Sequence, residues 1–208
     1  MAPDAFLLFL AAWTLLALSP GPAVMYVMSQ SARHGMRGGV AATLGIVSGH
    51  LFTFSAVALG LAALLAKYSD AIAGIRIVGA LYLMYLGVKM LMSKTRIDVP
   101  LAANGSAPPP RHGIALQGLA VQLTNPKNLL FVFALLPQFI RPGYPLLLQL
   151  GIMLTLTILI DGAFLLGYAH LAARGARALK GSKLITWLER VFGAALIFFG
   201  LKLLASRR

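Results

Sequence analysis

Six long apolar runs set the strongest constraint on what this chain can fold into. Each is long enough to supply the ~20 apolar residues that a helix needs to cross a bilayer. The runs cover residues 5–28, 38–66, 72–92, 114–140, 145–173 and 185–205. Their apolar residues are continuous rather than alternating, which disfavours the strands of a membrane barrel. The sequence therefore predicts an all-α integral membrane protein with six transmembrane helices.

The composition also indicates a membrane protein. Of the 208 residues, 59% are hydrophobic and 11% are charged, whereas soluble domains are about 25% charged. The net charge of +13 comes from Lys and Arg residues that mostly lie between the apolar runs, where such residues anchor helices at the interface. We therefore expect the lipid bilayer, and no nucleic acid, as their partner. The N-terminus lacks the basic segment of a signal peptide, so we expect the first run to be retained.

Basic residues are unevenly divided between the two sides of the predicted topology. Loops one, three and five carry nine Lys and Arg residues, and the opposite side carries five. Short loops rich in Lys and Arg tend to stay in the cytoplasm. This bias predicts that both termini lie on the outer side of the membrane. The accessibility of a terminal tag in intact cells would test that orientation.

The chain divides into two similar halves. Residues 98–113 form a flexible linker rich in Pro, Gly and Ala, and residues 1–97 and 114–208 each hold three predicted spans. With one gap, the third span aligns with the sixth, so that Arg76 matches Arg190. Because three is an odd number, the second half must enter the membrane from the opposite face. This predicts two inverted three-helix repeats, an architecture of many secondary transporters.

The first span of each half contains a helix breaker, SPGP at residues 19–22 and TNPKN at residues 124–128. An unpaired backbone group in hydrocarbon costs several kcal/mol, so a break persists only beside protein or a polar cavity. Half-helix ends present N–H groups with partial positive charge and carbonyls with partial negative charge. A zwitterionic amino acid needs both. The alternative is a packing kink, but breaks at matching places in both halves favour a binding site.

The predicted substrate-binding residues are those of the two breaks and a nearby glutamine. They are Ser19, Pro20, Gly21, Pro22, Gln122, Thr124, Asn125, Pro126, Lys127 and Asn128. Lys127 lies near the centre of its span, where a charge costs at least about 2.5–3.5 kcal/mol. A register shift could let it snorkel to the interface. If it stays deep, it should face a cavity and an anion, either a substrate carboxylate or Asp161. For Gln122 and Thr124, hydrogen bonding to the backbone beside the break is an equal alternative.

Asp161 is the only acidic residue deep inside a predicted span, and such a carboxylate is a functional-site hypothesis by default. His50 lies at a comparable depth in the second span. The second and fifth spans are symmetry counterparts, so the two side chains can approach one another. A His–Asp pair that gains and loses a proton suits proton-coupled transport. The alternative is a structural hydrogen bond between helices, typically worth about 0.6 kcal/mol.

Glycines in the second span are spaced for close helix packing. They are Gly38, Gly39, Gly45 and Gly49. Glycine-rich faces also pack between protomers, so a homodimer is compatible with the sequence. The chain has no cysteine, which excludes disulfides and thiol chemistry. No GxxxxGK[ST] phosphate loop and no histidines at metal-ligand spacing occur, so we expect neither a cofactor nor a metal.

Two stretches carry a family resemblance. SPGPAVMYVMSQSARHGMRGGVAATLGIVSG and GLAVQLTNPKNLLFVFALLPQFI together resemble the lysine-exporter (LysE) family, and within it the homoserine/threonine-resistance type. The resemblance implies a multi-pass protein of the bacterial inner membrane, so the outer side that the charge bias predicts for both termini is the periplasm. It implies export of amino acids similar to homoserine, threonine or leucine, driven by the proton gradient.

The same resemblance assigns roles to particular positions. PGP at residues 20–22 and NPK at residues 125–127 hold the family's signature positions. Asp161 looks like the acidic residue often found in the family's fifth span. His50 stands where relatives carry small or acidic residues, which departs from the family pattern.

Two rival functions would need residues other than those that amino-acid export needs. A carrier of another small solute, such as a metal ion, would need several inward carboxylates or thiolates, and Asp161 is the only candidate. An intramembrane enzyme with His50 and Asp161 as acid and base would also need a nucleophile or a cofactor site. The sequence offers neither, so we expect a transporter rather than an enzyme.

Overall fold

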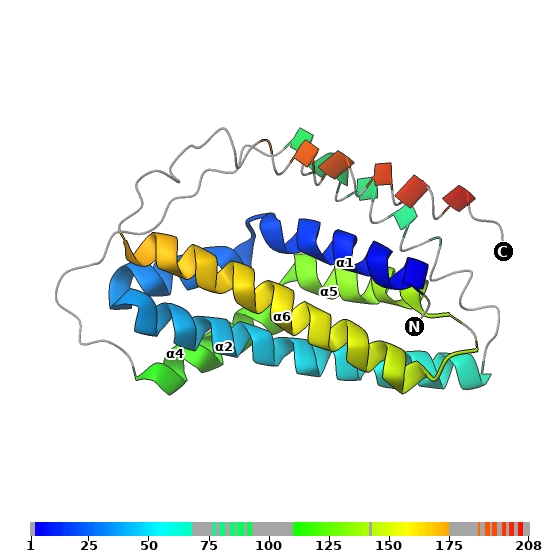
Figure 1. Cartoon of the computed structure of the whole chain (residues 1–208), viewed down its shortest axis with the longest axis horizontal. Coiled ribbons are helices and arrows are strands. Elements are labelled where there is room, and N and C mark those ends of the chain that lie inside the picture. The colour runs from blue at the N-terminus through cyan, green and yellow to red at the C-terminus, as the bar shows by residue number, and fades with distance from the viewer. Residues whose placement is uncertain are drawn as a thin grey trace.

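The described part of the chain is a bundle of long helices (Figure 1). The computed structural model describes residues 3–67, 110–141 and 143–174, with scattered positions between 77 and 92 and between 187 and 205. The elements are α1 (Pro3–Leu18), α2 (Pro22–Lys67), α4 (Arg111–Thr124), α5 (Pro126–Leu135), the 3-10 helix η1 (Leu136–Phe139) and α6 (Leu146–Ala173). No strand occurs in these ranges, so the prediction of an all-α protein is confirmed for them.

α2 is in fact two helices that join at Gly35. This residue has a φ of 65°, a conformation that glycine adopts readily because it has no Cβ. The first expected span, 5–28, therefore consists of α1 and the start of α2. The second expected span, 38–66, is the remainder of α2.

Length and apolar composition give the candidate membrane spans of the described part. Pro22–Gly60 and Leu146–Ala173 are each long and apolar enough to cross a bilayer. Arg111–Thr124 and Pro126–Phe139 form a third candidate, bent by 52° at the break between them. The fifth expected span and the broken fourth span thus lie where the sequence predicts them.

The third and sixth expected spans and the linker 98–113 lie largely outside the described residues. Among the positions that are described, Gly87 and Gly193 meet closely, because a Cβ on Gly87 would lie 2.5 Å from the carbonyl oxygen of Gly193. Figure 1 shows the described positions of these two segments side by side. The complete arrangement of six helices as inverted repeats stays a prediction.

Small residues allow α2 to pack closely on its neighbours α4 and α6. A Cβ on Gly45 would overlap the carbonyl oxygen of Ala115, and a Cβ on Gly118 would lie 2.7 Å from the carbonyl oxygen of Ala42. The helix backbones are therefore in direct contact at this crossing. A Cβ on Gly49 would meet the side chain of Gln122. The packing role predicted for these glycines of the second span is confirmed.

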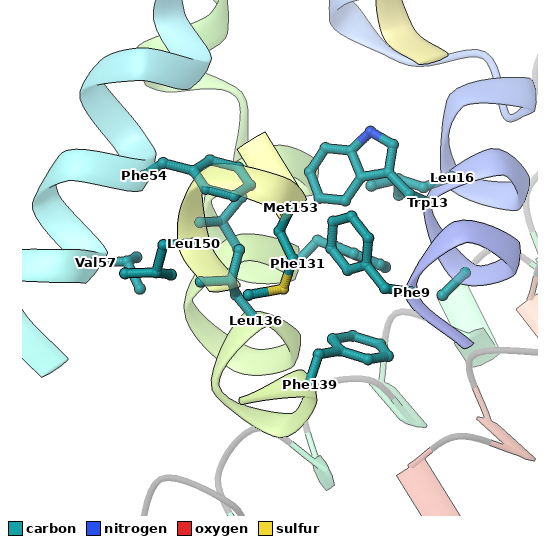
Figure 2. Packing of buried hydrophobic residues seen from close by; sticks show 12 residues of the cluster. Phe9, Trp13, Leu16, Phe54, Val57, Phe131, Leu136, Phe139, Leu150 and Met153 are labelled. Atoms are coloured by element: carbon teal, nitrogen blue, oxygen red, sulfur yellow. The ribbon is translucent and has the colours of Figure 1, made fainter. Parts of the chain in front are cut away.

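Two apolar clusters form the core and lie on either side of the breaks. The aromatic cluster, shown in part in Figure 2, consists of Phe9, Ala12, Trp13, Leu16, Phe54, Val57, Phe131, Val132, Leu136, Phe139, Leu150 and Met153. The aliphatic cluster consists of Val24, Val27, Met28, Ala41, Ala42, Ile46, Ile114, Leu165, Ala169 and Ala172. Seven buried polar residues lie along the chain between members of the two clusters, and they are Ser19, His50, Thr53, Gln122, Asn125, Asn128 and Thr157.

The close contact of α2 with α4 predicts that Gly45→Ala destabilises the fold. The added methyl group forces the two helix backbones apart, and overpacking of this kind costs about 1–3 kcal/mol. We expect a lower midpoint of thermal unfolding for the detergent-solubilised protein. Gly151→Ala is the matched control, because nothing lies within 4 Å of a Cβ placed there. Equal midpoints for the two variants would contradict this packing.

Candidate functional site

The two helix breaks meet at a cavity of about 50 Å³ between the aromatic and aliphatic clusters. It is lined by Leu16, Ala17, Ser19, Gly21, Ala23, Val24, Gln122, Asn125, Lys127, Asn128, Asp161, Phe164 and Leu165. Six of the ten predicted substrate-binding residues belong to this lining. The cavity is thus built from both breaks and from α6, segments that lie far apart in the sequence.

The second break is formed by a single residue, Asn125. Its backbone, with φ of -70° and ψ of 106°, ends α4, and its side-chain oxygen accepts a hydrogen bond from the Lys127 N–H at 3.1 Å. Its carbonyl accepts from the N–H of Leu129 at 3.0 Å. Pro126 follows as the first residue of α5, where its missing N–H costs nothing. Asn-Pro therefore stops one helix and starts the next.

The first break has a similar arrangement, in which Gly21 precedes the first proline of α2 as Asn125 precedes the first proline of α5. The Gly21 carbonyl accepts from the N–H of Met25 at 2.9 Å, and Pro22 is the first residue of α2. The N–H groups of Ala23 and Val24 are in the first turn, where a helix provides no backbone acceptor. Both residues line the cavity. The positive end of α2 is therefore directed at the cavity.

The C-terminal end of α1 is held by side chains from the other half of the chain. The Lys127 ammonium donates to the carbonyls of Leu16 at 2.9 Å and Ser19 at 2.5 Å. The Tyr168 hydroxyl donates to the carbonyl of Leu18 at 2.8 Å. Carbonyls at a helix C-terminus carry partial negative charge and need donors. Lys127 thus lies at the cavity, as predicted, with these backbone carbonyls among its partners.

His50 and Asp161 are in direct contact. The distance from His50 Nε2 to Asp161 Oδ2 is 2.7 Å. The Trp13 indole N–H donates to the other carboxylate oxygen at 2.9 Å, and the Gln122 amide nitrogen lies 3.2 Å from His50 Nε2. The His50 side chain is fully buried, whereas that of Asp161 is 16% exposed and lines the cavity. Asp161 therefore links the buried histidine to the cavity.

Three buried polar side-chain atoms at the cavity have no hydrogen-bond partner within the described part of the chain. They are Ser19 Oγ, Gln122 Oε1 and Asn128 Nδ2, and each residue is at most 4% exposed. Leaving such a group unpaired costs about 1–3 kcal/mol. Buried polar groups of this kind call for an explanation, and a polar ligand in the cavity supplies one.

The remaining predicted residues lie outside the cavity lining. Thr124 is exposed, and its hydroxyl donates to the Ala120 carbonyl at 2.8 Å, as the backbone alternative predicts. Pro20 is buried, and Pro22 and Pro126 are exposed at the first positions of α2 and α5. These prolines shape the breaks. Among the described residues, no three His, Asp or Glu side chains gather as a set of metal ligands would.

Sequence reasoning missed the apolar residues of the lining, which are Leu16, Ala17, Ala23, Val24, Phe164 and Leu165. It also missed two residues that bond to the site from outside the lining, Trp13 and Tyr168. Both lie within apolar runs, where an aromatic residue usually indicates packing. Each carries one polar group that needs a partner when buried, and that is the signal that was available. The partner cannot be read from spacing, because Trp13 and Asp161 are separated by 148 residues.

A comparison with known proteins decides the family. The model of the LysE type translocator family matches residues 14–207. The chain belongs to this family. The resemblance noted in the sequence is thereby confirmed, and the LysE chain is a membrane protein of a translocator family.

Relatives of this LysE-family chain are bacterial. It is 36% identical over 200 residues to the homoserine/homoserine lactone efflux protein of Salmonella typhimurium, covering 96% of this chain and 95% of that protein. It is 34% identical over 125 residues to the leucine efflux protein of Enterobacter sp. (strain 638), covering 60% and 58%. It is 30% identical over 206 residues to an uncharacterized membrane protein of Vibrio cholerae, covering 97% of each. No solved structure matches the chain.

The geometry of the second break predicts that Asn125→Ala destabilises the protein. Substitution by alanine removes the hydrogen bond from the Lys127 N–H to the side chain and should cost about 0.5–2 kcal/mol. Asn125→Ser is the matched control, because its hydroxyl can still cap α5. We expect the midpoint of thermal unfolding in detergent to fall more for Ala than for Ser. Identical midpoints would show that the cap does not hold this break.

Proposed function

We propose that this chain is a secondary transporter that exports neutral amino acids across the bacterial inner membrane. The observation that carries the proposal is the cavity at the two breaks, with its unpartnered Ser19, Gln122 and Asn128 atoms and its helix ends of both polarities. The printed names of two relatives, which describe efflux of homoserine or its lactone and of leucine, support the direction and the class of substrate.

The cavity wall offers complementary groups for each part of an amino acid. The N–H groups of Ala23 and Val24, at the positive end of α2, and Asn128 Nδ2 suit the carboxylate. The acceptor atoms Ser19 Oγ and Gln122 Oε1 suit the ammonium. The apolar part of the lining, which is Leu16, Ala17, Phe164 and Leu165, suits an uncharged side chain.

The two apolar clusters provide a gate on each side of this site. In our proposal, the packed aromatic cluster closes one side of the cavity region and the packed aliphatic cluster closes the other. In our proposal, residues 1–97 and 114–208 are inverted repeats, joined by the linker 98–113, that rock against one another. Separation of one cluster opens the site to one side while the other cluster stays packed, which is alternating access.

The His50–Asp161 pair is the proposed proton-coupling element. Its carboxylate faces the cavity while its imidazole is fully buried, so a proton that enters from the cavity can be shared within the pair. Trp13 fixes the carboxylate by donating to its second oxygen. In this antiport, a proton that binds to the pair moves into the cell while an amino acid moves out.

Efflux from cells that express this chain tests the proposed function. Cells are loaded with dipeptides that contain a panel of amino acids, and the medium is assayed over time. We expect selective release of one or a few neutral amino acids, retained in the matched variant Thr124→Val, whose side chain lies outside the cavity lining. No release of any amino acid, with the protein verified in the membrane, would instead indicate another small solute.

Asp161→Asn separates coupling from binding. Asparagine can still accept from Trp13 but cannot share a proton with His50 as a carboxylate does. We expect purified Asp161→Asn in liposomes to bind substrate and to lose efflux driven by a proton gradient. A pH dependence of efflux identical to that of the unchanged protein would remove Asp161 from the coupling role.

A further inference from the structure

The carbonyl oxygens of Leu16 and Ser19 form a site that already holds an ammonium group. Lys127 Nζ donates to both of them, at 2.9 and 2.5 Å. All three residues line the cavity. The two carbonyls belong to the C-terminal end of α1, where the helix dipole concentrates partial negative charge. The chemistry of this site is therefore that of a receptor for a primary ammonium ion.

We propose that these two carbonyls are the subsite for the α-ammonium of the transported amino acid, and that Lys127 fills this subsite when the transporter is empty. The inference rests on the proposed function and sharpens it. An α-ammonium and a lysine side-chain ammonium present the same donors and the same charge. Lys127 is thus a tethered competitor of its substrate.

A glycine lies directly beside the Lys127 side chain. This side chain runs over Gly21, where a Cβ would lie 3.3 Å from Lys127 Cδ and 3.8 Å from Nζ. The absence of a side chain at Gly21 leaves the lysine stem room to swing. When a zwitterion enters, its ammonium takes the two carbonyls, its carboxylate meets the N–H groups at the start of α2, and Lys127 is displaced from the carbonyls.

Tethered competition has a consequence for transport. Without a cation, the empty carrier would lose a charged hydrogen-bond donor at the carbonyls of Leu16 and Ser19, which is unfavourable for buried acceptors. Lys127 removes this cost and so assists the return of the empty carrier. The same lysine weakens substrate binding, which favours release during export.

An intramembrane lysine can instead act as a fixed partner of the substrate carboxylate. That role predicts the opposite change in substrate affinity when Lys127 is removed. Removing a fixed carboxylate partner weakens substrate binding. Removing a competitor strengthens it. The sign of the change in dissociation constant for Lys127→Ala therefore separates the two roles.

The test measures homoserine binding to the purified full chain in detergent by calorimetry. We expect Lys127→Ala to bind about two- to tenfold more tightly than the unchanged protein, which corresponds to one competing hydrogen-bonded group. Lys89→Ala, at an exposed position outside the cavity, should bind with unchanged affinity. Lys127→Gln keeps an N–H donor for the carbonyls and serves where the alanine variant does not fold. Weaker binding by either folded Lys127 variant would overturn the inference.

A second measurement uses ethylammonium chloride, which carries the ammonium without the carboxylate. It should raise the unfolding temperature of Lys127→Ala and leave Lys89→Ala and the unchanged protein unaffected, with sodium chloride as the ionic-strength control. An equal effect on all three proteins would overturn the subsite. If no amino acid binds to any of the proteins, the proposed function fails, while the ethylammonium result still reports on the subsite.

Discussion

The backbone groups exposed at the two helix breaks are the constraint on which the rest of the structure depends. Hydrocarbon supplies no hydrogen bonds, so each half-helix end must find its partners within the protein. The end of α1 obtains them from Lys127 and Tyr168, and the start of α5 obtains one from Asn125. Because Lys127 and Tyr168 come from the second half of the chain, the first break is satisfied only when the two halves are in contact.

The same requirement explains where the polar chemistry lies. Apolar clusters flank the region on both sides, and the breaks between them create helix ends with opposite partial charges around one cavity. Asp161 faces this cavity and carries the buried His50 behind it. In the proposed function, one region therefore combines a site for a zwitterion, a proton-exchanging pair and two gates.

Local signals in the sequence predicted the breaks, because proline and glycine act on the helix that contains them. Run lengths predicted the described spans, and the symmetry of the halves suggested the approach of His50 to Asp161. The donors that satisfy the first break were not predictable, since Tyr168 lies 150 residues from its partner Leu18. Thr124 was placed at the site because it adjoins Asn125, but the helical turn directs it outward. Local sequence therefore predicts where a helix breaks. Tertiary packing decides which side chains face that break.

Cysteine labelling at the cavity offers the most direct measurement of whether the breaks form a substrate site. The chain has no cysteine, so single-cysteine variants give no background. Ala17 lines the cavity, and Thr124 is exposed outside it. We expect the exported amino acid to slow the reaction of Ala17→Cys with a small methanethiosulfonate reagent and to leave Thr124→Cys unchanged. Equal labelling rates of Ala17→Cys with and without that amino acid would contradict a binding site at the breaks.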